Sequence, residues 1–174
     1  MADEAKPASI RHLLLTAVIS SSLITGLLSL GFTGWVTKTQ EEVKSQRAWK
    51  ERSVAELLGP ISMQLDRTKG ALDRWTKQNL YIEAKIMKTG NETVRDLLLT
   101  KGHLIPPDLI PDANRLIEHY DVWLELYEKH RGGKEPDLKA EFVFAGSEGY
   151  GFPKEAEAHF KERLRLFMKE LYGV

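Results

Sequence analysis

The sequence predicts an all-α protein with a single N-terminal transmembrane helix, a helical stalk and a cytoplasmic bundle of about four helices. Three observations support this fold class. Residues 13–36 carry no charged side chain, later apolar residues recur at the three- and four-residue spacing of helices, and glycine and proline separate the helical stretches. One irregular segment rich in aromatic residues, 142–152, interrupts the predicted bundle.

Residues 13–36 form the predicted membrane helix, and residues 1–12 form a tail before it. A helix rises about 1.5 Å per residue, so this stretch spans roughly 36 Å, enough for a hydrocarbon core about 30 Å thick. The stretch is longer than the apolar region of a secretory signal peptide, and no Ala-x-Ala cleavage pattern follows it. A signal peptide and a buried core helix are therefore the weaker alternatives.

Basic residues on either side of the span predict its orientation. Two precede it, Lys6 and Arg11, and a larger group follows it. The positive-inside rule then places the N-terminus outside and the C-terminal domain in the cytoplasm. The chain has no cysteine, which agrees with a cytoplasmic domain and also with a periplasmic domain that lacks disulfides. The basic residues after the span are Lys38, Lys44, Arg47, Lys50 and Arg52.

Small residues along one face of the span predict contact between membrane helices. Such residues recur every four positions, and Ser22 and Gly26 widen the stripe. Small side chains let two helix backbones approach closely, and hydroxyls can bond across the contact. We therefore expect a homo-oligomer; a hydroxyl-lined pore, or hydroxyls bonded back to their own helix, are the alternatives. The residues predicted to pack are Ala17, Ser21, Ser22, Thr25, Gly26, Ser29 and Thr33.

A juxtamembrane stalk is expected at 37–59, followed by an α-helical soluble domain at 60–174. A heptad pattern that starts in the stalk predicts a long helix with an apolar seam, kinked or restarted at Gly59-Pro60. The seam packs either within the chain or in a parallel coiled coil between chains. Additional apolar residues widen it and favour packing within the chain. The seam residues are Val54, Leu58, Ile61, Leu65, Leu72, Trp75, Asn79, Ile82 and Ile86.

Further helices are expected after this seam. Residues 89–91, Thr-Gly-Asn, are expected to break the helix, with Asn91 capping a second helix over 92–101. A proline-rich apolar loop at 104–111 then leads into an amphipathic helix that begins at Pro111 and ends before Gly132-Gly133. The last helix is expected to start at Pro153 and to end near Gly173.

The aromatic segment 142–152 has too many aromatic residues for a plain linker and too much glycine for a helix. One interpretation is an extended segment whose aromatic side chains cover the bundle. The other is a docking loop for a protein partner, or the lip of a ligand pocket.

No catalytic signature is present in the sequence. The absence of cysteine excludes thiol catalysis and thiolate metal sites, and residues 146–151 lack the Lys-Ser/Thr end of a phosphate-binding loop. Neither a Gly-x-Ser-x-Gly nor a His-Glu-x-x-His motif occurs. We expect no catalytic residue, no metal site and no cofactor. The histidines are expected to be surface or satisfied core residues.

One basic cluster, around the expected helix break at 89–91, is the best candidate for a binding site. A helix N-terminus there would add free N–H groups and partial positive charge, which suits an anionic, nucleotide-like ligand. The alternative is pairing with the C-terminal half, because residues 38–101 hold four more basic than acidic residues and 102–174 hold four more acidic than basic. The cluster consists of Lys85, Lys88, Arg95, Lys101 and His103.

The sequence thus favours a non-enzymatic, membrane-anchored interaction or assembly module that self-associates through its membrane helix and stalk. A bacterial signalling or defence effector that senses an anionic ligand at the membrane is the second hypothesis. An accessory subunit of a larger membrane complex is the third. The expected partners are the lipid bilayer and further copies of the chain. No nucleic-acid partner is expected, because the excess of basic residues is weak.

Overall fold

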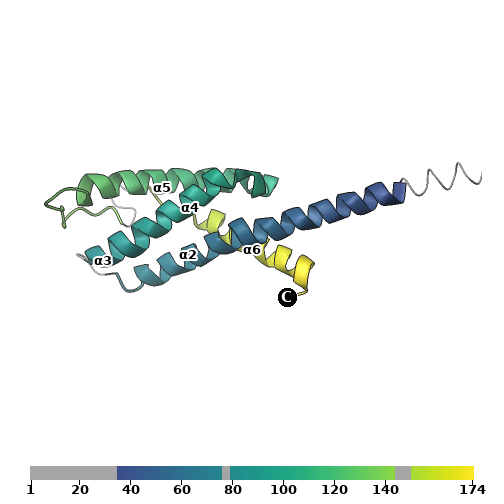
Figure 1. Ribbon diagram of the computed structural model, residues 1–174. Coiled ribbons are helices and arrows are strands. Elements are labelled where there is room, and N and C mark those ends of the chain that lie inside the picture. The colour runs from purple at the N-terminus through teal and green to yellow at the C-terminus, as the bar shows by residue number, and fades with distance from the viewer. Residues whose placement is uncertain (1–34, 76–78, 144–149) are drawn as a thin grey trace, which may run out of the picture. The chain divides into compact units, whose positions relative to one another are not determined.

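The computed structural model describes residues 35–75, 79–143 and 150–174, and every regular element in them is a helix (Figure 1). The predicted all-α class is confirmed for these residues. The predicted tail, the membrane span up to residue 34 and all seven predicted packing residues lie outside them. Among the residues that are described, no helix is both long and apolar enough to cross a bilayer.

The chain divides into two units, Met1–Gln46 and Arg47–Val174. In the first unit, residues 35–46 are helical, and the Thr39 hydroxyl donates to the backbone carbonyl of Trp35 at 3.0 Å. In the second unit, Leu57 and Leu58, which the sequence assigns to the stalk, are completely buried in the core.

The second unit is a bundle of four main helical segments. Helix α4 packs along α2, α5 packs on α4, and α6 packs against η1, α2 and α5 (Figure 1). The short elements η1 and η2 are π-helical turns, and η3 and η4 are 3-10 turns. In chain order the elements are η1 (Val54–Leu58), α2 (Gly59–Leu72), α3 (Leu80–Ile82), η2 (Glu83–Lys88), α4 (Thr89–Thr100), η3 (Gly102–Leu104), η4 (Pro107–Leu109), α5 (Ile110–Arg131) and α6 (Lys154–Tyr172).

The helix does not restart at Gly59-Pro60: helical backbone runs through η1 into α2 without interruption, and a π-helical turn marks the position where the sequence predicts a kink or a restart. Helix α2 begins at Gly59 with Pro60 in its first turn, directly after the π-helical turn η1. Proline has no N–H to continue the regular ladder, and its ring crowds the preceding turn, so the helix widens there. The turn also needs glycine, because a Cβ at position 59 would lie 2.8 Å from the carbonyl oxygen of Val54.

The single long seam helix is wrong. Helix α2 ends at Leu72, and the chain restarts as a helix at Leu80, where the Asn79 side chain accepts a hydrogen bond from the N–H of Ile82 at 3.1 Å. The residue expected to fix the register of a coiled coil is instead a helix cap. The chain then returns along α2, so the seam is divided between two packed helical segments.

The seam residues accordingly face the interior of one chain. Val54, Leu58, Ile61 and Leu65 are buried in the main core, and Ile82 is buried in a second cluster. The remaining seam residues, Leu72, Trp75, Asn79 and Ile86, are half-buried. Packing within the chain therefore describes this seam, and an intermolecular coiled coil would have to expose its buried members.

The break expected at residues 89–91 is also wrong. Helical backbone continues from Leu80 through η2 into α4, and Thr89, Gly90 and Asn91 form the first turn of α4. Close packing explains why position 90 is a glycine, since a Cβ there would lie 2.8 Å from Thr68 Oγ1 on α2. Glycine at this position lets α2 and α4 approach each other.

Substitution of two helical glycines should therefore have opposite effects. Gly70→Ala is expected to raise the free energy of unfolding by about 1 kcal/mol, because alanine favours helix and its Cβ would meet nothing within 4 Å. Gly90→Ala is expected to lower it by about 1–3 kcal/mol, because Thr68 is β-branched and stiff. Urea denaturation of both variants measures the difference, and Gly90→Ala combined with Thr68→Ala should recover the loss. Equal stabilisation by both single variants would contradict the close contact.

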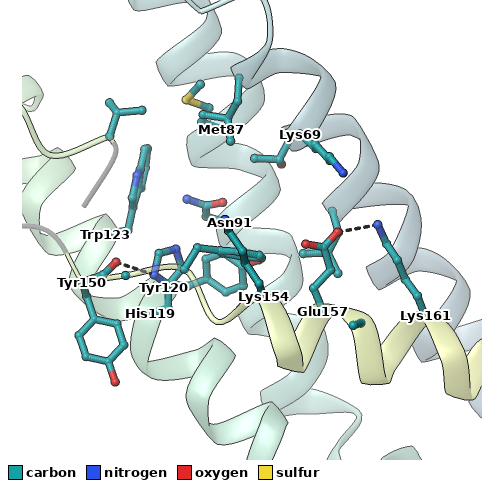
Figure 2. Close-up of a pocket in the computed structure, with 17 residues that line it drawn as sticks. Lys69, Met87, Asn91, His119, Tyr120, Trp123, Tyr150, Lys154, Glu157 and Lys161 are labelled. Carbon is teal, nitrogen blue, oxygen red and sulfur yellow. Dashed lines mark hydrogen bonds and ion pairs between the residues drawn. The ribbon is translucent and has the colours of Figure 1, made fainter. Parts of the chain in front are cut away.

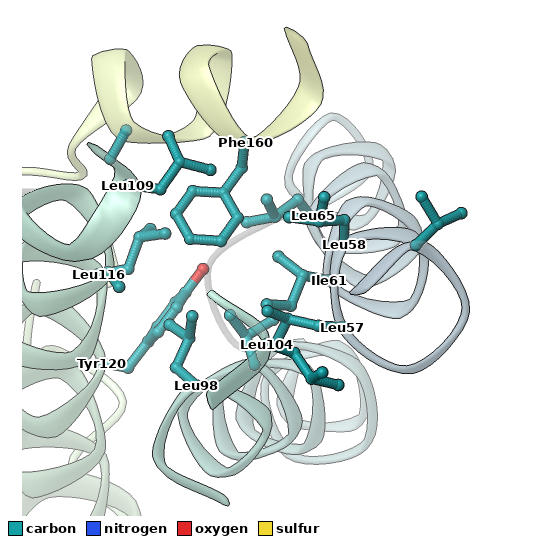
Figure 3. Close-up of a cluster of buried hydrophobic side chains, with 14 of the residues drawn as sticks. Leu57, Leu58, Ile61, Leu65, Leu98, Leu104, Leu109, Leu116, Tyr120 and Phe160 are labelled. Atoms are coloured by element: carbon teal, nitrogen blue, oxygen red, sulfur yellow. The ribbon is translucent and has the colours of Figure 1, made fainter. Parts of the chain in front are cut away.

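The main core lies where η1, α2, α4, α5 and α6 meet (Figure 3). Phe160 points from α6 into this cluster, toward Leu58 and Leu65 on one side and Leu109 and Leu116 on the other. The proline-rich loop contributes as expected, since Leu104 and Leu109 are buried and the Ser53 hydroxyl donates to the carbonyl of Leu104 at 2.8 Å.

A second apolar cluster contains an ion pair with almost no solvent access. Arg131 Nε lies 2.7 Å from Glu83 Oε2, and the side chains are 2% and 0% exposed. Trp75 Nε1 donates to Glu83 Oε1 at 3.1 Å, and Arg131 also donates to the carbonyl of Asp137. The pair thus ties the π-helical turn η2, the end of α5 and the segment after it into one network. The cluster comprises Ala71, Ile82, Met87, Trp123, Leu124, Tyr127 and Phe142.

Candidate ligand-binding cavity

A cavity of about 890 Å³ lies between α2, α4, α5 and the start of α6 (Figure 2). Its volume falls within the range of small-molecule pockets, roughly 300–1,000 Å³. Most of the wall is apolar, and a few polar side chains interrupt it, which is the usual composition of a ligand site. The larger apolar residues of the wall are Leu65, Leu72, Met87, Trp123, Val143 and Phe152.

Asn91 is the most informative residue of this wall. Its position in the first turn of α4 directs its amide into the cavity, between Met87 and His119 (Figure 2). The residue is only 5% exposed, and no group in the described part of the chain forms a hydrogen bond with its amide. Because buried polar groups are normally hydrogen-bonded, this amide is available to a bound molecule or to water inside the cavity.

His119 stands beside Asn91 and is held in a defined state. Its Nδ1 lies 3.0 Å from the carbonyl oxygen of Tyr150, which can only accept, so Nδ1 donates. Aromatic rings of Tyr120, Tyr150 and Phe152 surround the imidazole. Burial lowers the pKa of His119 below its ordinary value and outweighs the opposing effect of the Tyr150 carbonyl. A neutral ring with hydrogen on Nδ1 presents Nε2 as an acceptor.

Tyr120 supplies a third polar group. It is buried on α5 and lines both the main core and the cavity. Burial raises the pKa of its hydroxyl, with a smaller contribution from the charge of Glu157, so the group stays protonated. Residues 35–75, 79–143 and 150–174 form no hydrogen bond with this hydroxyl, which can both donate and accept.

Three lysines border the cavity, and they differ in their partners. Lys161 Nζ lies 2.6 Å from Asp66 Oδ1 and 2.5 Å from Glu157 Oε1, so two carboxylates neutralise it. Lys69 on α2 and Lys154 at the start of α6 form no ion pair with any described residue. The cavity wall is therefore mostly apolar with a few polar groups, and two of the lysines that line it, Lys69 and Lys154, have no acidic partner among the described residues (Figure 2).

Acidification below about pH 6.5 is expected to destabilise the domain through His119. The unfolded chain binds a proton in a pH range where the buried imidazole does not. The stability contribution is thus complete above the unfolded pKa and is lost as the pH falls through the lower folded pKa. Denaturation midpoints measured from about pH 7 to about pH 5 should fall less steeply for His119→Gln than for the native chain. Identical slopes would contradict this assignment.

The basic cluster predicted from the sequence does not form one site. Lys88 Nζ lies 2.6 Å from Glu128 Oε1, Arg95 pairs with Asp96 and Asp121, and Lys101 pairs with Glu56. Lys85 and His103 are exposed, and none of the five residues lines the cavity. The helix start that was to complete the anion site is absent, because α4 continues from η2 without interruption at Asn91.

The described parts of the aromatic segment, residues 142–143 and 150–152, lie at the edge of the cavity. Phe142 is buried against Trp123 and Tyr127, whereas Val143, Tyr150, Gly151 and Phe152 line the cavity. The Tyr150 hydroxyl also donates to Glu118 at 3.2 Å. Residues 144–149 lie outside the described residues. In the parts of the chain that the structure describes, no group of three or more acidic or histidine residues could hold a metal ion.

Sequence reasoning missed the residues that define the cavity. Asn91 was interpreted as a helix cap and His119 as a surface or satisfied core histidine, because neither spacing nor composition indicates which buried groups border an empty volume. The Gly90-Asn91 pair inside a stretch of good helix formers could have indicated the cavity. Glycine within a helix can mark a close contact with another helix, as found here, and a polar residue next to it is then an interior residue. No family model, curated protein or solved structure matches this chain.

Proposed function

We propose that the chain is a membrane-anchored, non-enzymatic sensor whose helical domain binds a small molecule in the cavity between α2, α4, α5 and α6. One observation carries this proposal: a volume of about 890 Å³ with the unpaired, buried amide of Asn91 directed into it. A polar group without a partner in an apolar wall costs stability unless something satisfies it. Binding sites accept this cost because the ligand supplies the missing hydrogen bonds.

The sequence supports the membrane part of the proposal. Residues 13–36 carry no charge, and the basic residues that follow them favour a cytoplasmic domain. The small-residue stripe from Ala17 to Thr33 supports self-association of the membrane helices. Ligand occupancy of the domain would then be transmitted to an oligomer in the bilayer.

Native mass spectrometry of the full-length protein, extracted gently from its own membrane, tests the proposal. We expect a defined oligomer in which each copy retains one discrete small molecule. Ala158→Trp, which introduces a large side chain at the cavity wall, should remove that mass. Leu166→Trp, on the same helix but away from the cavity, should retain it. Protein without any bound molecule, and without thermal stabilisation by a small-molecule extract of its source cells, would contradict ligand sensing.

The assembly module ranks second. Its support now comes from the membrane stripe alone, because the buried seam residues are already used inside the domain. The same mass spectrum separates the two proposals, since an oligomer without a retained molecule favours assembly.

The accessory-subunit proposal ranks third. Exposed apolar side chains such as Met63 and Tyr81, at 69% and 71%, favour it, but isolated exposed apolar residues are common on protein surfaces. A bare monomer in the same experiment would put this proposal first.

A further inference from the structure

We infer that the cavity binds a nucleoside monophosphate or a closely similar anion, with a planar heterocycle inside the cavity and a phosphate at its border. This inference rests on the proposed function, because it names the class of ligand for the same cavity. It follows from three features of the wall: the hydrogen-bonding groups in its interior, the aromatic and sulfur-containing surface beside them, and the charges at its border.

The interior polar groups require a ligand with a hydrogen-bonding edge. The Asn91 amide presents a donor and an acceptor side by side, a pattern that matches the edge of a purine or of a lactam ring. His119 adds an acceptor at Nε2, and Tyr120 adds a hydroxyl. An aliphatic tail in the same place would leave the Asn91 amide, the Nε2 atom of His119 and the Tyr120 hydroxyl without partners, so the wall disfavours a fatty acid or a lipid chain.

The surface beside these groups suits a flat ring. The indole of Trp123 is held by Tyr127, with ring centroids 5.5 Å apart and planes 20° from parallel, and it lines the cavity. Met87 adds a polarisable thioether on the neighbouring helix. Aromatic side chains stack on nucleobases independently of base identity.

The border of the cavity suits a phosphate. Lys161 is neutralised by Asp66 and Glu157, but Lys69 and Lys154 have no acidic partner in the described ranges. The first turn of α6, which begins at Lys154, adds the partial positive charge of a helix N-terminus. A phosphate monoester carries nearly two negative charges at neutral pH, which matches two free ammonium groups.

Isothermal titration of the full-length protein in nanodiscs tests the inference, with adenosine 5′-monophosphate and guanosine 5′-monophosphate as probes. We expect at least one nucleotide to bind about tenfold or more tightly than its nucleoside, because only the nucleotide carries the anion that the lysines at the border would pair with. Lys69→Ala combined with Lys154→Ala should abolish that preference and leave nucleoside binding unchanged. Asn91→Leu, which is similar in size, should weaken nucleotide and nucleoside alike. Lys85→Ala, outside the cavity, is the matched control and should change nothing.

Several results would overturn the inference. Nucleotide binding that is indifferent to Asn91→Leu and to the double lysine variant would place the anion elsewhere. In a second result, dodecanoate would bind the native protein more tightly than either nucleotide does, and the Asn91→Leu variant more tightly still. That result would identify an aliphatic ligand. That second result would refute the ligand class while leaving the proposed sensor intact, because the cavity would still be occupied. A mass spectrum without any retained molecule, together with no thermal stabilisation by the small-molecule extract, is the separate result that removes the sensor itself.

Discussion

Glu83→Ala should lower the free energy of unfolding of the helical domain by about 3–5 kcal/mol, the loss typical of breaking a buried ion pair. The substitution leaves the Arg131 guanidinium, 2% exposed, without its carboxylate in an apolar cluster. Trp75 Nε1 loses an acceptor at the same time. The effect should appear in urea denaturation followed by circular dichroism, with the midpoint lowered and the helix content of the folded state preserved.

Two further variants isolate the charge from the packing. Glu83→Leu combined with Arg131→Met should recover much of the loss, because apolar side chains can replace a buried pair, although the carbonyls bound by Arg131 lose their donor. Glu162→Ala removes an exposed ion pair with Arg165 and should leave the denaturation midpoint unchanged. A Glu83→Ala midpoint as high as that of Glu162→Ala would show that the buried pair carries no stability.

Phe160→Ala is the second substitution with a large expected effect, a loss of about 3–5 kcal/mol, because it opens a cavity in the main core. Phe160 is completely buried where α6 meets α2 and α5 (Figure 3). The loss should also loosen α6, whose first turn borders the ligand cavity. Hydrogen exchange of α6 amides measures that second consequence directly.

Comparison within α6 provides the control for this substitution. Leu166 lies on the same helix and is 37% exposed, so Leu166→Ala should change stability by about 0.5 kcal/mol or less. Phe160→Leu should fall between the two, since it retains part of the buried volume. A Phe160→Ala loss no larger than that of Leu166→Ala would mean that α6 is held by its ion pairs and not by the core.

Local pattern was sufficient to predict the helical class and several helix boundaries. The predicted start of an amphipathic helix at Pro111 lies one residue from the start of α5, and its predicted end falls at Gly132 as observed. The final helix likewise begins after Pro153 and ends at Gly173, whose φ of 75° suits glycine. These boundaries depend on backbone chemistry within a few residues, so the sequence alone carries the information.

The same kind of pattern failed at Asn79 and at Gly90-Asn91. Heptad spacing predicted one helix through Asn79, but the side chain of Asn79 caps a new helix and the chain folds back. Glycine followed by asparagine predicted a break, but close packing of α4 on α2 keeps both residues helical. In each case the local sequence is compatible with two structures, and tertiary packing selects one of them.

The sequence by itself determined the helical class, the uncharged stretch at 13–36 and the absence of cysteine chemistry, because each follows from residue type and short-range spacing. Only the tertiary structure decided that the seam packs within the chain, that Glu83 meets Arg131, and that Asn91, His119 and Tyr120 border one cavity. Glu83 and Arg131 are 48 positions apart, and Asn91 lies on a different helix from His119. Contacts of this kind depend on how helices pack in three dimensions, which no local pattern specifies.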